Sequence, residues 1–166
     1  MSSPTILVAT CLSIACGASA PRKRNPDTVV PFKKIGDVVL NLHVYNPQGH
    51  TKTDTRPAIV FFFGGGWNKW NPAHFSRQSA YFASRGMVGI CAEYRVKSVH
   101  GTPPSVCVTD GKSAMRYVRA HARELGIDPK RIAAGGGSAG GHVAAAAALS
   151  GGVDEPGEDT TGSCRP

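Results

Sequence analysis

Acidic residues are scarce in this chain of 166 residues, where 11 Asp and Glu face 19 Lys and Arg and the formal net charge is +8. Such an excess can signal nucleic-acid binding, but the basic residues are dispersed and no aromatic platform or nucleic-acid motif accompanies them. Charged residues make up 18% of the sequence and apolar residues 41%, as in a folded domain rather than a disordered chain. The composition therefore argues against nucleic-acid binding and indicates one globular domain.

Long apolar runs and metal-binding patterns are also missing. The N-terminal apolar stretch, residues 6–16, is too short to cross a bilayer. The five cysteines show no Cys/His spacing of a zinc site. We expect Cys91 to be a small buried thiol in a core strand. The sequence thus indicates neither a membrane span nor a metal site.

The apolar stretch also resembles part of a signal peptide, because an Ala-x-Ala sequence that resembles a secretory cleavage site, Ala18-Ser19-Ala20, follows it. We predict a signal peptide over residues 1–20, followed by a basic, proline-containing linker over residues 21–28. The protein would then be secreted or periplasmic. A disordered cytoplasmic tail is the alternative, since no Lys or Arg precedes the apolar stretch.

Strand-like and helix-like segments alternate after the linker. Residues 29–35 and 38–45 are typical of an antiparallel hairpin that turns at Gly36-Asp37. Further strands are predicted at 58–63, 87–94 and 132–134, and helices at 72–85, 110–125 and 143–149. Alternating strands and helices predict a parallel sheet with right-handed crossovers.

A serine lies between the last predicted strand and the last predicted helix. The sequence Gly136-Gly137-Ser138-Ala139-Gly140 matches the pattern G-x-S-x-G. A strand, tight turn, serine and helix in this order lift the hydroxyl into the open as a nucleophile. The small neighbours let the backbone double back without a clash. Ser138 is therefore the candidate nucleophile.

A glycine-rich turn follows the buried strand 58–63 and reads Gly64-Gly65-Gly66-Trp67. Backbone N–H groups leaving such a strand have no ladder partner. Together with the N–H of Ala139 they can converge on a developing oxyanion, and each such donor is worth roughly 3 to 4 kcal/mol of barrier. Gly64, Gly65, Gly66 and Ala139 are the candidate oxyanion donors.

Several motifs occur in one order, namely Phe-Gly-Gly-Gly-Trp (63–67), Ala-Glu-Tyr-Arg (92–95), the segment 110–119, Gly-Ile-Asp-Pro (126–129) and Gly-Gly-Ser-Ala-Gly-Gly-His (136–142). In this the sequence resembles the α/β-hydrolases, in particular esterases and lipases whose oxyanion loop reads His-Gly-Gly-Gly-Trp. Phe63 replaces that histidine. The resemblance implies a three-layer αβα sandwich around a mostly parallel sheet. It also implies a carboxylic ester hydrolase without metal or organic cofactor, acting on small-molecule or polysaccharide-linked esters.

One part of the family pattern is missing. The family order is Ser, then Asp or Glu, then His, and His142 is the one histidine after Ser138. We expect His142 to pack against the sheet. The acidic residues at 154–159 lie in a Gly/Pro/Thr-rich stretch without strand character. We interpret residues 29–150 as the N-terminal part of the hydrolase domain and 151–166 as an acidic tail leading into a missing portion, and we expect negligible turnover.

Two other functional classes stay open. Gly135, Gly137 and Gly140 also fit the dinucleotide fingerprint G-x-G-x-x-G, although two βα units precede it and no strand-end acid follows. A catalytically inactive, hydrolase-like binding module would fit the missing triad partners. Further expectations concern single side chains: Trp67 and His100 as possible pocket residues, and Asp110 as a helix N-cap.

Overall fold

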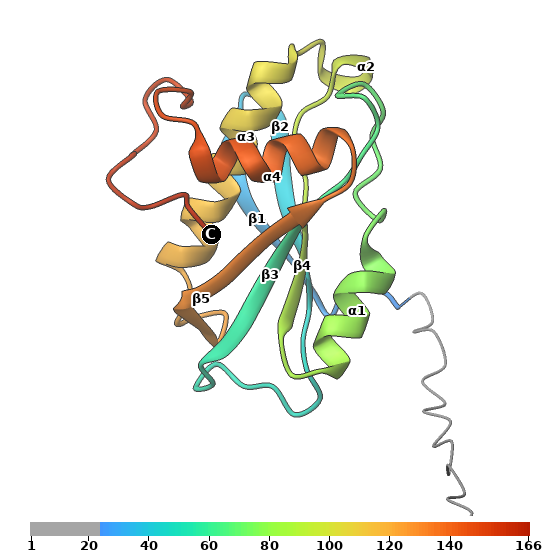
Figure 1. The fold of residues 1–166 in the computed structure, drawn as a ribbon, viewed down its shortest axis with the longest axis vertical. Coiled ribbons are helices and arrows are strands. Elements are labelled where there is room, and N and C mark those ends of the chain that lie inside the picture. Colours follow the sequence, from blue (N-terminus) through green and yellow to red (C-terminus); the bar gives the residue numbers. More distant parts are fainter. Residues whose placement is uncertain (1–23) are drawn as a thin grey trace, which may run out of the picture.

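The computed structural model describes residues 24–166, so the predicted signal peptide lies outside the described residues. The described chain folds into one sheet with helices on both faces (Figure 1). The strands are β1 (Thr28–Ile35), β2 (Val38–Tyr45), β3 (Arg56–Phe62), β4 (Val88–Ala92) and β5 (Ile127–Gly136). The helices are α1 (Ser76–Ser84), α2 (Lys97–His100), α3 (Pro104–Ala120) and α4 (Ala139–Leu149).

The order of strands across the sheet is β1-β2-β4-β3-β5. Strand β2 is antiparallel to both β1 and β4, whereas β3 is parallel to β4 and β5. The predicted hairpin and the predicted parallel sheet are therefore confirmed. Because β3 and β5 are parallel neighbours with Phe62 opposite Gly136, the turns that follow both strands leave from the same edge of the sheet.

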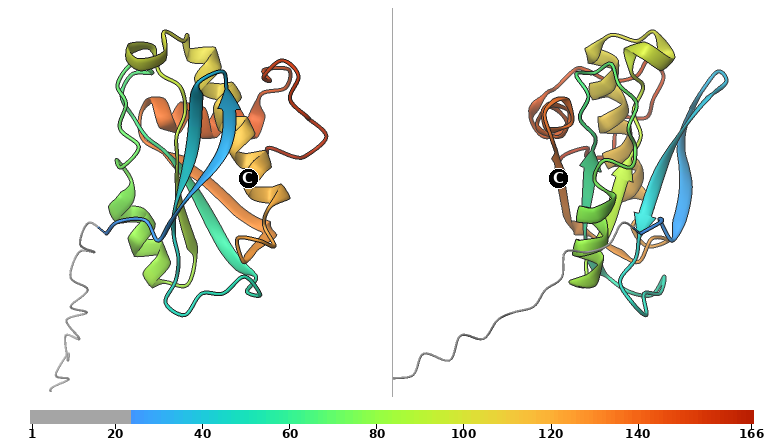
Figure 2. Two further views of the ribbon diagram at one scale, coloured as in Figure 1. Left: turned by 180° about the vertical axis from the view of Figure 1, so that it is seen from behind. Right: turned by 90° about the vertical axis from the view of Figure 1, so that its right-hand side faces the viewer.

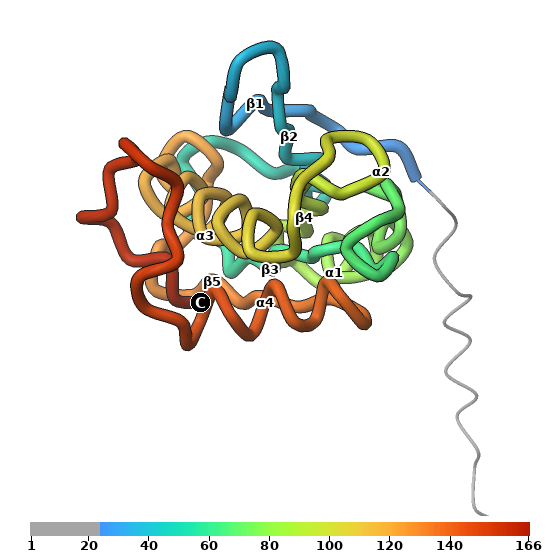
Figure 3. Tube along the Cα trace, turned by 90° about the horizontal axis from the view of Figure 1, so that it is seen from above, coloured from blue at the N-terminus to red at the C-terminus, as the bar shows by residue number. Residues whose placement is uncertain are grey.

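The sheet separates two apolar cores, because alternate side chains of a strand point to opposite faces. Val44 and Ile90 belong to the larger core, which α3 and α4 cover, whereas Tyr45 and Cys91 belong to a smaller core against α1. Views from the side and from above show the resulting layers, with α4 across β5 and β3 (Figures 2 and 3). The three-layer αβα architecture is confirmed. No helix within residues 24–166 is both long and apolar enough to cross a bilayer.

Helix α3 differs most from the prediction, since it begins at Pro104 rather than at Asp110. Proline fits the first turn of a helix, where its missing N–H is not needed. Asp110 therefore lies inside the helix, is 0% exposed, and accepts hydrogen bonds from the Arg95 side chain at 2.8 and 2.9 Å. The predicted N-cap role of Asp110 is wrong, because its carboxylate pairs with cations instead.

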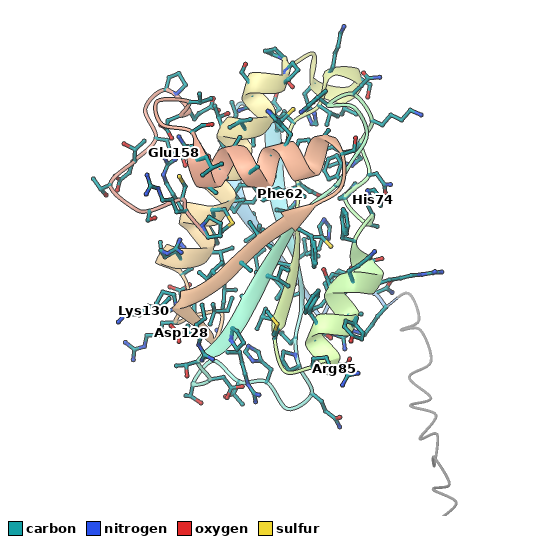
Figure 4. All side chains as sticks on the ribbon, viewed as in Figure 1. Phe62, His74, Arg85, Asp128, Lys130 and Glu158 are labelled. Atoms are coloured by element: carbon teal, nitrogen blue, oxygen red, sulfur yellow. The ribbon has the colours of Figure 1, made fainter. Side chains whose placement is uncertain are left out.

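Residues 151–166 form no helix or strand but are joined to α3 by ion pairs. Glu155 contacts Lys33 at 3.0 Å, and Asp154 contacts Lys112 at 2.8 Å. Figure 4 labels Glu158 in this tail. We use the name ion-pair cluster for Lys33, Arg95, Asp110, Lys112, Arg116, Asp154, Glu155 and Glu158.

Candidate active site

Ser138 occupies a strained corner between β5 and α4. Its backbone angles are φ 53° and ψ −121°, a region that costs a non-glycine residue on the order of 1 to 3 kcal/mol. A Cβ added at Gly140 would lie 2.1 Å from the carbonyl oxygen of Phe62, and one at Gly136 would lie 2.5 Å from the oxygen of Gly140. Glycine at both positions therefore lets α4 begin directly against the end of β3, and Ser138 itself stays exposed.

The predicted oxyanion loop forms the second corner, directly after β3. Gly66 and Trp67 have positive φ angles of 62° and 57°. The carbonyl oxygen of Gly65 accepts hydrogen bonds from the N–H groups of Asn68 and Lys69, at 3.1 and 2.9 Å, which closes the turn. The loop therefore turns back on itself within a few residues.

The four candidate donors differ in what they contact. The N–H of Gly64 donates to Nδ1 of His74 at 3.0 Å. Among residues 24–166, no acceptor is found for the N–H groups of Gly65, Gly66 and Ala139. Three of the four amides therefore have no acceptor within the described part of the chain, and the fourth is engaged with His74.

The two corners touch through backbone atoms. A Cβ added at Gly64 would lie 2.7 Å from the carbonyl oxygen of Gly137. On its other side the loop is held by α2, because the N–H of Lys97 donates to the carbonyl of Trp67 at 3.0 Å. The sequence did not predict α2, which has a single turn and no apolar periodicity. The structure thus brings the glycine loop and the serine turn to one place.

Aromatic rings border the two corners. The ring of Trp67 meets that of His142 edge-on, with centroids 5.5 Å apart, and Trp70 meets His100 at 5.2 Å. Nδ1 of His100 accepts the N–H of Val96 at 3.0 Å, so this ring is anchored to its own turn. His142 is exposed, and the expectation that it packs against the sheet is wrong. The first turn of α4 carries it outward, toward Trp67.

Two buried carboxylates, Glu93 and Asp110, are engaged with other partners. Burial raises the pKa of Glu93, but hydrogen bonds from His43 at 2.9 Å and from Asn41 at 2.8 Å outweigh it, and the pKa lies below its usual range. Asp110 pairs with Arg95 as described above. Neither carboxylate is therefore free to orient a histidine base at Ser138.

Cys91 is 2% exposed, which confirms the predicted buried thiol. Burial raises the pKa of this thiol to about 11, so it is not a competing nucleophile at neutral pH. Residues 24–166 contain no group of three or more His, Cys, Asp or Glu side chains arranged to hold a metal ion. Ser138 is thus the side chain that the local geometry favours for nucleophilic chemistry.

His74 is the contact that sequence reasoning missed. It lies in the polar loop between β3 and α1, where Figure 4 labels it, and no periodicity or motif singles it out. The replacement of the expected histidine by Phe63 was the one signal that another side chain supports the loop.

A serine with positive φ on a strand-to-helix corner, in contact with a glycine loop from the neighbouring parallel strand, is the arrangement of the α/β-hydrolase esterases. The BD-FAE family model matches residues 42–164, and the chain belongs to this family.

Known relatives agree with this class. Carboxylesterase NlhH of Mycobacterium tuberculosis is 31% identical over 114 residues, which cover 68% of this chain and 34% of NlhH. The apo form of esterase 2 from Thermogutta terrifontis is 48% identical, with a TM-score of 0.82 over 87% of this chain and 54% of that chain. Its propionate-bound form gives 48% identity and a TM-score of 0.82, over 87% and 53% of the two chains. This chain thus spans about a third of NlhH and about half of the solved esterase.

Proposed function

We propose that this chain carries the nucleophile and the oxyanion donors of a carboxylic ester hydrolase. The observation that supports the proposal is the backbone contact between Gly64 and Gly137. Ser138, next to Gly137, is strained and exposed, and the amides of Gly65 and Gly66, next to Gly64, have no acceptor among residues 24–166. Strain of this kind persists where the surrounding structure fixes a reactive group. The N-terminus of α4 adds a positive dipole end at the same place.

The proposed reaction is acyl transfer through Ser138. Its Oγ forms a bond to the ester carbonyl carbon while a histidine base takes the hydroxyl proton. The resulting oxyanion accepts hydrogen bonds from the amides of Gly65, Gly66 and Ala139. The carbon–oxygen bond to the alcohol then breaks, the alcohol leaves with the proton, and water releases the acid from the serine. These steps need neither a metal nor an organic cofactor.

We propose short-chain carboxylic esters as substrates, free or linked to polysaccharides. Esterase 2 of Thermogutta terrifontis has been solved with propionate and with butyrate bound. Trp67 and His100 would border the acyl or alcohol group. Export by a signal peptide over residues 1–20 remains part of this proposal, because a secreted enzyme meets polysaccharide esters outside the cell.

Labelling with an organophosphonate tests the nucleophile. Esterase 2 of Thermogutta terrifontis is phosphonylated by sarin. Because no histidine base is assigned to Ser138 within residues 24–166, labelling will be slow. After prolonged incubation with excess reagent we expect mass spectrometry to locate a single adduct on Ser138, absent from Ser138→Ala and retained in Ser98→Ala, a serine that lies on α2. An adduct that persists in Ser138→Ala would refute the assignment.

Turnover by this chain alone is expected to be negligible, because loss of a triad member costs on the order of 10⁴- to 10⁶-fold in rate. The assay is hydrolysis of p-nitrophenyl acetate by the purified chain. Rapid hydrolysis that Ser138→Ala abolishes would contradict the low turnover while supporting the nucleophile.

A catalytically inactive binding module is the second candidate, and the engagement of Glu93 and Asp110 with other partners favours it. Such a module would bind an ester without forming an adduct. A dinucleotide-binding domain would instead shift its melting temperature with a nicotinamide dinucleotide, which the esterase proposal does not predict.

A further inference from the structure

One peptide group at the entrance of the glycine loop is held at both ends by side chains. The carbonyl oxygen of Phe63 accepts a hydrogen bond from the Tyr94 hydroxyl, and the N–H of Gly64 donates to Nδ1 of His74 at 3.0 Å. These two groups belong to the same peptide bond. Tyr94 follows β4 and His74 precedes α1, so two separate segments meet on this peptide.

We propose that Tyr94 and His74 form a clamp that fixes the plane of the Phe63–Gly64 peptide and thereby aims the N–H groups of Gly65 and Gly66 at the site. Both are positioning residues, since neither is proposed to touch the substrate. The inference rests on the proposed oxyanion role of the loop and adds the residues that set its orientation.

The Tyr94 end of the clamp is built into the core. Tyr94 is 0% exposed, and its ring stacks on that of Phe63 with centroids 4.0 Å apart and planes 9° apart. Burial raises the pKa of the Tyr94 hydroxyl, which keeps it protonated and able to donate. Phe63, which stands in place of the family histidine, therefore orients the loop through its ring and its carbonyl group.

The Gly64 end of the clamp is closely packed on the side where a side chain would lie. A Cβ added at Gly64 would lie 2.7 Å from the oxygen of Gly137 and 3.4 Å from Cε1 of His74. A flip of the peptide would break both hydrogen bonds at once and leave the buried Phe63 carbonyl without its partner, which is costly. The contact with the Ser138 corner and the contact with His74 thus constrain the same residue.

The hydrogen bond also fixes the state of the imidazole. Because Nδ1 accepts, the neutral His74 ring carries its proton on Nε2. Asparagine is the matched replacement, since its Oδ1 occupies nearly the position of Nδ1 and can accept the same N–H. Phenylalanine keeps a ring and removes the acceptor.

The test combines NMR with labelling of the whole chain. In the ¹⁵N-labelled protein we expect a pyridine-type shift for Nδ1 of His74 and a coupling across the hydrogen bond to the Gly64 nitrogen. His74→Phe should speed exchange of the Gly64 amide and slow organophosphonate labelling of Ser138, each about tenfold, as for one lost hydrogen bond. His74→Asn should restore both to within about threefold of the wild type.

His100→Phe is the control, because its Nδ1 also accepts a backbone N–H but on a different turn. It should leave the exchange of the Gly64 amide unchanged. The clamp is refuted if His74→Phe leaves the exchange of the Gly64 amide unchanged, if it leaves the labelling rate unchanged when the wild type labels, or if His74→Asn behaves like His74→Phe. If His74→Phe does not fold, two other measurements test the clamp. These are the ring nitrogen shifts of His74 in the wild type and the exchange of the Gly64 amide in His74→Asn.

The outcomes also separate this inference from the proposed function. If no protein labels, wild type included, the esterase proposal fails, and the exchange of the Gly64 amide alone still tests the clamp. If labelling occurs but is indifferent to His74, the esterase proposal stands and the clamp falls.

Discussion

The two glycine corners and the ion-pair cluster are held together by opposite means. At the corners, backbone meets backbone between Gly64 and Gly137, and close packing leaves no space for a Cβ at Gly140. In the ion-pair cluster, charged side chains on α3 meet carboxylates from the tail, and the cations at the centre are almost fully buried. The stability of the corners should therefore depend on side-chain volume, whereas the stability of the ion-pair cluster should depend on charge and pH.

Among the substitutions considered, removal of Asp110 should lower the stability of the protein most, because it disrupts the ion-pair cluster. This carboxylate is 0% exposed and lies 2.9 Å from Nζ of Lys33 and 2.8 Å from Arg95. Asp110→Ala leaves Lys33 and Arg95 with Glu155 as their remaining carboxylate partner. Because these buried cations lose their fully buried partner, we expect a loss of about 3 kcal/mol in the free energy of unfolding, measured by urea denaturation. Asp128→Ala, which breaks an exposed pair with Arg131, should cost much less. Equal losses would contradict the contrast between buried and exposed pairs.

Gly140→Ala should disrupt the contact between α4 and the end of β3, because the added methyl group has no space there. Its new Cβ would lie 2.1 Å from the oxygen of Phe62, and we expect a loss of roughly 1 to 3 kcal/mol in the free energy of unfolding. This reverses the usual gain from alanine in a helix. Gly141→Ala is the control, since its Cβ would meet its nearest atom at 3.3 Å. Equal stability of the two variants would show that the corner is looser than the structure indicates.

Acid should loosen the tail without disturbing the corners. Hydrogen bonds from Lys112 and then Arg116 hold the pKa of Asp154 below its usual value. A carboxylate with a lowered pKa in the folded state stabilises the protein above its unfolded pKa, and this stabilisation is lost as the pH falls through the folded pKa. Limited proteolysis of residues 151–166 should therefore accelerate below about pH 4. An unchanged rate would contradict the prediction, as would cleavage in the two glycine corners at the same pH as cleavage of the tail.

Local patterns predicted the fold well where neighbours in sequence determine it. Strand β2 was predicted with the observed bounds, because apolar and polar residues alternate along it. The start of α3 was missed because Asp110 was predicted to cap the helix, whereas Asp110, Lys112 and Arg116 are buried inside it and form ion pairs. Their partners lie mainly in β1 and the tail, far along the chain, and a helical pattern of apolar residues carries no information about them.

The same distinction holds for the site. A motif and its flanking elements led to Ser138 and to the glycine loop, and the register of β3 against β5 brings the two together. The hydrogen bond from Gly64 to His74 could not be read from the sequence, because it joins two loop residues whose approach depends on the path of the chain into α1. Motifs pointed to the proposed nucleophile and donors, and the supporting contacts required coordinates.

The contact between the corners has a consequence for divergence. It is made of main-chain atoms and glycine positions, whereas the border of the site is made of side chains such as Trp67, Trp70 and His100. Substitutions on that border leave the meeting point of the two turns unaltered. A lineage can therefore change the side chains that border the site one residue at a time, while the two glycine corners are inherited intact.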